Sequence, residues 1–141
     1  MMISSRGRYA LRVMLDMAKQ HSTQNISVRD LAARQNISRK YLESIMTALC
    51  KANLIESETG KDGGYRLRRA PEEYTAGEVL RAVEGELAPV SCVTPDGKKC
   101  DGACGCIALP FWQGLEQHIN TYVDSYTLQE LLTSQQEKKE N

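Results

Sequence analysis

Four of the five cysteines in this 141-residue chain lie close together, at Cys92, Cys100, Cys104 and Cys106. Their spacing is C-x7-C-x3-C-x-C, in a segment rich in glycine, proline, aspartate and lysine. Thiolates bind zinc ions and iron–sulfur clusters. Structural zinc sites typically use two cysteine pairs that lie far apart, so this spacing favours a cluster, of the 2Fe–2S or 4Fe–4S type, which isolated protein can lack. Thiols without a metal and a zinc site are the alternatives.

The cysteine segment, residues 86–107, has neither helical nor strand periodicity and is predicted to be a loop. A loop of this length within a compact domain usually has a function. No apolar run is long enough to span a bilayer and no signal-peptide apolar region is present, so we expect a cytoplasmic protein without membrane contact. In that compartment, clustered cysteines favour metal or redox chemistry over structural disulfides. Cys50 lies outside the loop and is predicted to be a small core residue.

The stretch 26–67 carries a second functional pattern: two short helices, a tight turn and a hairpin. Ser27 and Ser38 are predicted N-caps, and a helix from Ser38 to about Ala52 has one apolar and one polar face. The apolar positions are Leu42, Ile45, Met46 and Leu49, and the polar ones are Arg39, Lys40, Glu43, Ser44, Thr47 and Lys51. A second helix that opens with small polar and basic residues is typical of helix-turn-helix proteins, in which it enters the DNA major groove.

The hairpin that follows alternates apolar and polar residues around a glycine-rich turn at 59–64. Tyr65 and Leu67 are predicted to face inward, and Arg66 and Arg68 outward. We interpret this hairpin as a wing with a basic outer edge. A plain helical domain whose basic face is merely solvated is the alternative.

The charges divide between the two halves of the chain. Residues 1–70 contain 13 Lys/Arg and 6 Asp/Glu, whereas residues 71–141 contain 5 and 12, although the whole chain has no formal net charge. A basic half beside an acidic half is expected if the first half meets phosphates and the second does not.

Further helices are predicted on both sides of this stretch. The helix 6–20 supports the helix-turn-helix, with an Arg12–Asp16 pair on its outer side. A short helix capped by Thr75 has outward residues Glu78, Arg81 and Glu84. A long helix over 107–126 has an apolar stripe of Trp112, Leu115, Ile119, Tyr122 and Val123, which we assign to a two-fold dimer interface, with packing inside one chain as the alternative. One or two helical turns follow Thr127, and residues 133–141 are predicted to be a frayed polar tail.

Taken together, these motifs resemble the Rrf-two family of bacterial winged-helix transcriptional regulators, which has IscR-, NsrR- and CymR-like members. The resemblance rests on S-x-x-G-R-Y-A-L-x-x-M-L at 4–15, I-S-x-x-Y-L-E at 37–43, G-G-Y-x-L at 63–67 and A-G-E-V-L-x-A-V-E-G at 76–85. It implies a mostly α fold with a small β-hairpin: a winged helix-turn-helix domain over 1–85, a cysteine sensor loop over 86–107, and a dimerisation helix with a C-terminal tail over 108–141.

The resemblance also implies a homodimer that binds a pseudo-palindromic operator in double-stranded DNA. Cys92, Cys100 and Cys106 match the family's cluster ligands. Leu109 stands where IscR-like members use a histidine, so Cys104 is the candidate fourth ligand. The positions implied to contact DNA are Ser38, Lys40, Tyr41, Glu43 and Ser44; Arg39, Lys61, Arg66 and Arg68 complete the predicted DNA-binding set.

Three functions are open at this point. The first is a DNA-binding regulator, a repressor, that senses iron–sulfur or redox status through the cysteine loop. The second is a CymR-like regulator of cysteine or sulfur metabolism, controlled by a protein partner without a cluster. The third is a thiol oxidoreductase, which the absence of C-x-x-C and the sequence distance of both histidines from the cysteines disfavour. We therefore predict a regulator and not an enzyme.

Overall fold

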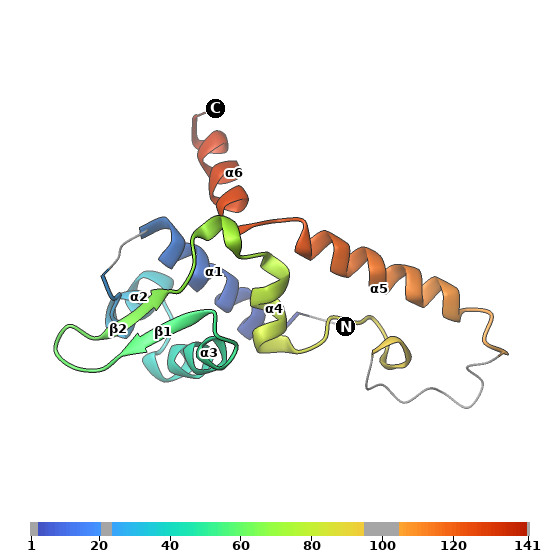
Figure 1. The fold of residues 1–141 in the computed structure, drawn as a ribbon, viewed down its shortest axis with the longest axis horizontal. Coiled ribbons are helices and arrows are strands. Elements are labelled where there is room, and N and C mark those ends of the chain that lie inside the picture. The colour runs from blue at the N-terminus through green and yellow to red at the C-terminus, as the bar shows by residue number, and fades with distance from the viewer. Residues whose placement is uncertain (1–2, 21–23, 95–104, 141) are drawn as a thin grey trace.

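The computed structural model of this protein describes residues 3–20, 24–94 and 105–140, and it is mostly helical with one small β-hairpin, as predicted (Figure 1). The elements are α1 (Ser5–Gln20), α2 (Val28–Gln35), α3 (Arg39–Lys51), β1 (Ile55–Glu58), β2 (Gly64–Leu67), the 3-10 helix η1 (Pro71–Glu73), α4 (Ala76–Glu84), the 3-10 helix η2 (Ser91–Val93), α5 (Leu109–Asp124) and α6 (Leu128–Glu140). None of the described helices combines the length and apolar character needed to cross a membrane.

Helix starts follow the predicted caps. The hydroxyls of Ser27, Ser38 and Thr75 each accept a hydrogen bond from the backbone N–H three residues later, which satisfies a donor that the first turn leaves free. Between α2 and α3, Asn36 adopts the left-handed conformation with φ 54° and ends α2. This short turn sets the start of α3 beside α2.

One hydrophobic core joins the first four helices and the hairpin. Met14 of α1, Leu31 of α2 and Leu49 of α3 are completely buried in it. Each such side chain contributes about 1.5–3 kcal/mol through its removal from water. The predicted apolar face of α3 is confirmed, because its four residues are all buried.

The outer face of α1 differs from its prediction. Asp16 does not pair with Arg12; its Oδ1 lies 2.9 Å from Nη2 of Arg34 on α2. That hydrogen-bonded contact raises the pKa of Arg34 above its ordinary value. Arg12 lies over the ring of Tyr9 instead, with its guanidinium carbon 5.0 Å from the ring centroid.

The C-terminal segment also differs from its prediction, because α6 continues to Glu140 where a frayed tail was expected from residue 133. Its start is a capping box: Glu130 N–H donates to the Thr127 hydroxyl at 3.0 Å, and the Glu130 carboxylate accepts from Thr127 N–H at 2.9 Å. Leu128 is completely buried in the core, and its N–H donates to the carbonyl of Tyr74. Anchoring to the core at this end therefore supports a helix whose composition alone suggests a tail.

Helix α5 projects away from this body (Figure 1). It runs from Leu109 to Asp124, two residues shorter at each end than the predicted 107–126, and Pro110 lies in its first turn as predicted. None of its residues is buried. Its base is fastened to α4, because Arg81 makes two hydrogen bonds to the Asp124 carboxylate at 2.8 and 2.9 Å. Gly77 of α4 permits this approach, since a Cβ there would collide with Asp124.

Candidate nucleic-acid interface

The first two turns of α3 present the largest group of predicted DNA-contacting residues on one exposed surface. Ser38, Arg39, Lys40, Glu43 and Ser44 are all exposed there. A helix N-terminus carries a partial positive charge and unpaired N–H groups, and two adjacent cations add to it. This end of α3 is therefore chemically suited to phosphate groups.

Tyr41, from the same predicted set, has a different environment. It is half-buried, its ring meets the ring of Tyr9 edge-on at 5.9 Å, and its hydroxyl lies 3.1 Å from the Ser5 hydroxyl. Arg6 of α1 also reaches α3, since its guanidinium donates to the carbonyl of Ser44 at 3.3 Å. Tyr41 thus packs α3 onto α1 as well as lying near the exposed surface.

The wing, residues 55–68, has the predicted alternation but a different charge. Tyr65 and Leu67 pack against the core while Arg66 is exposed. In the strand register Glu56 lies directly opposite Arg66, and its Oε2 is 2.9 Å from Nη2 of Arg66. The predicted basic outer edge is wrong, because carboxylates of β1 accompany the guanidiniums along this face.

The tip of the wing carries exposed Lys61, beside Asp62. The Nδ2 of Asn25, ahead of α2, donates to the Glu58 carboxylate at 2.6 Å and to the Asp62 carbonyl at 3.1 Å. Below the tip, Ile26 and Tyr65 exchange two backbone hydrogen bonds of 2.8 Å. The segment before α2 therefore supports the wing along its length.

Tyr74, which the sequence did not single out, fastens the wing to the body. It is completely buried, and its hydroxyl donates to the Leu54 carbonyl at 2.6 Å and accepts from Arg68 N–H at 2.9 Å and Arg69 N–H at 3.0 Å. The Arg69 guanidinium lies over the Tyr74 ring and binds Glu78 of α4 at 2.6 Å, which raises the pKa of Arg69. The only advance indication is general: a buried tyrosine needs a partner for its hydroxyl.

Glu84 is the second residue whose role was not predicted. It was expected to face outward, but its side chain caps α1. Its Oε1 accepts from Ser4 N–H at 2.9 Å, the Ser4 hydroxyl at 2.5 Å and Gly7 N–H at 3.0 Å. A Cβ at position 7 would lie 2.6 Å from that oxygen, so a larger residue there would displace the Glu84 carboxylate. The last residue of α4 before the cysteine loop thus contacts the start of α1, which itself contacts α3.

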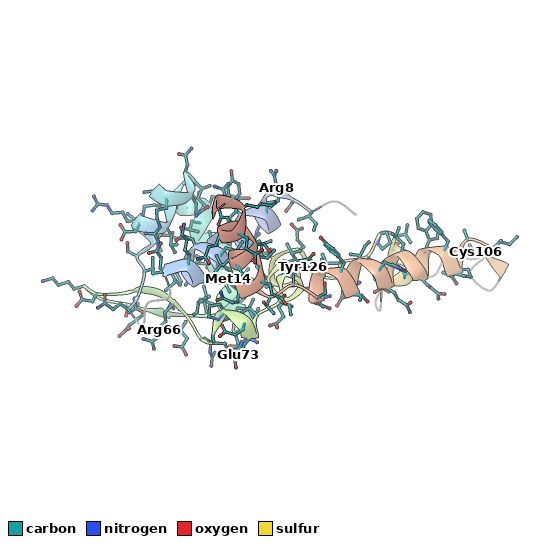
Figure 2. All side chains as sticks on the ribbon, turned by 90° about the horizontal axis from the view of Figure 1, so that it is seen from above. Arg8, Met14, Arg66, Glu73, Cys106 and Tyr126 are labelled. Atoms are coloured by element: carbon teal, nitrogen blue, oxygen red, sulfur yellow. The ribbon has the colours of Figure 1, made fainter. Side chains whose placement is uncertain are left out.

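The cysteine loop is described only in part. Cys92 and Cys106 are half-buried free thiols, and Cys106 lies at the end of α5 remote from the body that contains Met14 (Figure 2). Cys100 and Cys104 lie outside the described residues. Within the described ranges, no three His, Cys, Asp or Glu side chains are placed to hold a metal ion. Cys50 packs beside the core as predicted, and burial raises the pKa of its thiol.

Comparisons with known proteins find relatives of the same kind by sequence and by structure. The model of the Rrf2 (Rrf-two) family, described as iron-dependent transcriptional regulators, matches residues 3–134. The HTH-type transcriptional regulator IscR of Aliivibrio salmonicida is 36% identical over 132 residues, which cover 94% of this chain and 77% of that protein. Protein rrf2 of Nitratidesulfovibrio vulgaris is 35% identical over 132 residues, covering 94% and 87%.

Two solved structures share the fold over most of the chain. CymR, the global cysteine regulator of B. subtilis, superposes with a TM-score of 0.76 at 33% identity, covering 95% of this chain and 98% of CymR. IscR of T. potens gives a TM-score of 0.77 at 30% identity, covering 98% and 90%.

Proposed function

The chain belongs to the Rrf2 family of DNA-binding transcriptional regulators, and we propose that it is a homodimeric repressor that binds a pseudo-palindromic operator in double-stranded DNA. The observation that supports this most directly is the exposed, cationic start of α3, held by α1 and α2 on a packed core. In the proposal this end of α3 enters the major groove and the wing lies beside it. The protein acts where bacterial DNA lies, in the cytoplasm.

Substitution on α3 tests the proposed docking. Lys40→Ala removes an exposed cation at the start of α3 and should weaken binding to a duplex selected from a random library by about 1–3 kcal/mol if it contacts a base. Lys51→Ala, which removes another exposed lysine at the other end of α3, is the matched control. Equal affinities for both variants, measured by fluorescence anisotropy, would contradict this orientation of α3.

Dimerisation is proposed through α5. Its Phe111 is 66% exposed and its Tyr122 64% exposed, on a helix that buries none of its residues in its own chain. Large exposed apolar side chains mark interfaces, and a two-fold dimer lets the same surface cover itself. Leu115→Glu should therefore give monomers in light scattering, whereas Gln113→Glu on the same helix should not. A Leu115→Glu dimer would contradict the interface.

An iron–sulfur cluster is proposed on Cys92, Cys100, Cys104 and Cys106. Four thiols within fifteen residues suit the donor chemistry of a cluster, and the curated relatives include IscR proteins. When bound, the cluster would make the loop responsive to iron, oxidants or nitric oxide. The loop follows Glu84, which binds α1, and it leads into α5, whose opposite end is tied to α4 by Asp124.

The second candidate function is regulation of cysteine or sulfur metabolism through a protein partner, without a cluster. The close match to CymR over nearly its whole length favours it. Anaerobic purification followed by visible absorption and by iron and sulfide analysis separates the two proposals. Brown protein whose iron is lost in Cys92→Ser but kept in Cys50→Ser supports the cluster. Colourless protein without iron supports the partner-controlled regulator.

A further inference from the structure

The outer face of the wing is electrically balanced by ion pairs centred on Glu56. The Glu56 Oε2 accepts from Nη2 of Arg66 at 2.9 Å and from its Nε at 3.0 Å. The other carboxylate oxygen, Oε1, lies 3.5 Å from Nε of Arg68. One carboxylate therefore contacts two guanidiniums, while Glu58 lies 3.6 Å from Arg66 and accepts a hydrogen bond from Asn25. Residues 55–68 as a whole contain three basic and three acidic side chains.

These ion pairs are not needed to hold the hairpin together. The four side chains are between 41% and 59% exposed, and exposed pairs of this kind add little to stability. The hairpin is held by its backbone ladder, by Ile55 in the core and by Tyr74. The side chains are therefore free to exchange partners, and the main effect of these ion pairs is on which anions the arginines can bind.

Carboxylates and phosphates present similar oxygen pairs to a guanidinium, so they compete for it. Arg66 and Arg68 can bind DNA phosphates only by leaving Glu56 or by bringing its negative charge close to the backbone. We propose that Glu56 competes with DNA phosphates for Arg66 and Arg68, and so keeps these two arginines out of sequence-independent binding. The inference rests on the proposed DNA-binding function and adds a specificity-determining residue to it.

The physical reason for such a residue is the nature of non-specific binding. Complexes with arbitrary DNA are held almost wholly by phosphate contacts, whereas specific complexes also use base contacts. Occupying two wing arginines lowers the phosphate contribution and leaves the α3 contacts unaffected. Binding then depends more on the base sequence, which is what limits occupancy of the many competing sites in a genome.

The test is Glu56→Gln, which keeps the side-chain length and removes the charge. Binding is measured by fluorescence anisotropy against salt, with a 30-base-pair duplex selected by the wild type from a random library and with a scrambled duplex of equal composition. At about 0.1 M salt we expect Glu56→Gln to bind the scrambled duplex roughly three to ten times more tightly than the wild type does. The slope of log K against log salt should become more negative by about 1–2, because each further phosphate that an arginine neutralises adds about 0.9.

Two further variants show that the effect passes through the wing. Glu137→Gln removes the same charge from exposed α6 and should bind like the wild type. Adding Arg66→Gln and Arg68→Gln to Glu56→Gln should return the slope to about the wild-type value, because both guanidiniums that pair with Glu56 are then absent. Thermal unfolding monitored by circular dichroism confirms that each variant is folded.

The outcomes are distinct. Unchanged or weaker binding by Glu56→Gln would overturn the inference, and weaker binding would mean that Glu56 positions the arginines for DNA. An equal increase in Glu137→Gln, or an increase that survives the loss of both Arg66 and Arg68, would also overturn it, since the effect would be one of overall charge. Absence of binding to any duplex by the wild type and by Glu56→Gln would overturn the proposed function, and this inference with it.

Discussion

Replacing Tyr74 by phenylalanine tests how the wing is fastened to the body. The change keeps the buried ring and removes a hydroxyl that has three backbone partners. The Tyr74 hydroxyl donates to the Leu54 carbonyl at 2.6 Å, in a fully buried hydrogen bond. It also accepts from the N–H groups of Arg68 and Arg69, and these two hydrogen bonds are only partly buried. The variant leaves these three groups to find other partners.

The expected loss follows from the burial of each partner. A buried carbonyl left unsatisfied costs about 1–3 kcal/mol, and two partly buried N–H groups that water can reach cost about 0.5 kcal/mol each. The free energy of unfolding should therefore fall by about 2–4 kcal/mol. With a denaturant slope of about 2 kcal/mol per molar, the urea midpoint should fall by about 1–2 M.

The assay is urea unfolding of both proteins at one protomer concentration, because association would otherwise shift the midpoint. Tyr9→Phe is the matched control, since Tyr9 is only partly buried and contacts Tyr41 and Arg12 through its ring. In native Tyr74→Phe, the amide protons of Arg68 and Arg69 should also exchange faster with solvent. A loss no larger than that of Tyr9→Phe, with unchanged exchange at both amides, would refute the assigned role.

Leu128→Ala should lower the free energy of unfolding by about 2–5 kcal/mol, because it opens a cavity where α6 enters the core; a loss below about 1 kcal/mol in urea unfolding would show that α6 is not anchored there. Gly7→Ala should destabilise by about 1–3 kcal/mol, since its Cβ displaces the Glu84 carboxylate from α1; a thermal midpoint equal to that of the wild type would exclude this contact. The hydrogen bond from Arg81 lowers the pKa of Asp124, so its contribution is present above the unfolded pKa of about 3.9 and disappears as the pH falls through the lower folded value. The free energies of unfolding of wild type and Asp124→Asn, measured in urea, should therefore differ by less than about 1 kcal/mol above pH 4, because the pair is partly exposed, and should converge below about pH 4. A difference that does not change with pH would contradict the ion pair.

Local patterns predicted the elements that position the candidate interface. Ser27 and Ser38 cap their helices through bonds that span three residues, so the sequence alone shows them. The apolar spacing on α3 identified its buried face, and the glycine-rich turn identified the wing. The motifs also indicated the family, which the comparisons confirm. The cysteine ligands and the DNA-contacting residues remain predictions.

The partners of charged side chains were decided by the tertiary structure. Asp16 had a suitable arginine four residues away, at Arg12, but it binds Arg34 on the neighbouring helix. Glu84 was expected to face solvent, but it caps a helix that begins about eighty residues earlier in the chain. Local spacing shows which partners are within reach along one element, whereas the packing of elements brings closer ones.

The balance of charge on the wing shows the same division. By itself, the sequence determined that Arg66 and Arg68 lie on the outer face, because strand residues alternate between faces. Only the register of β1 on β2 placed Glu56 opposite Arg66, and that pairing changes the surface from basic to neutral. The physical reason is that periodicity follows from the backbone geometry of one segment, whereas neutralisation depends on which segment lies beside it.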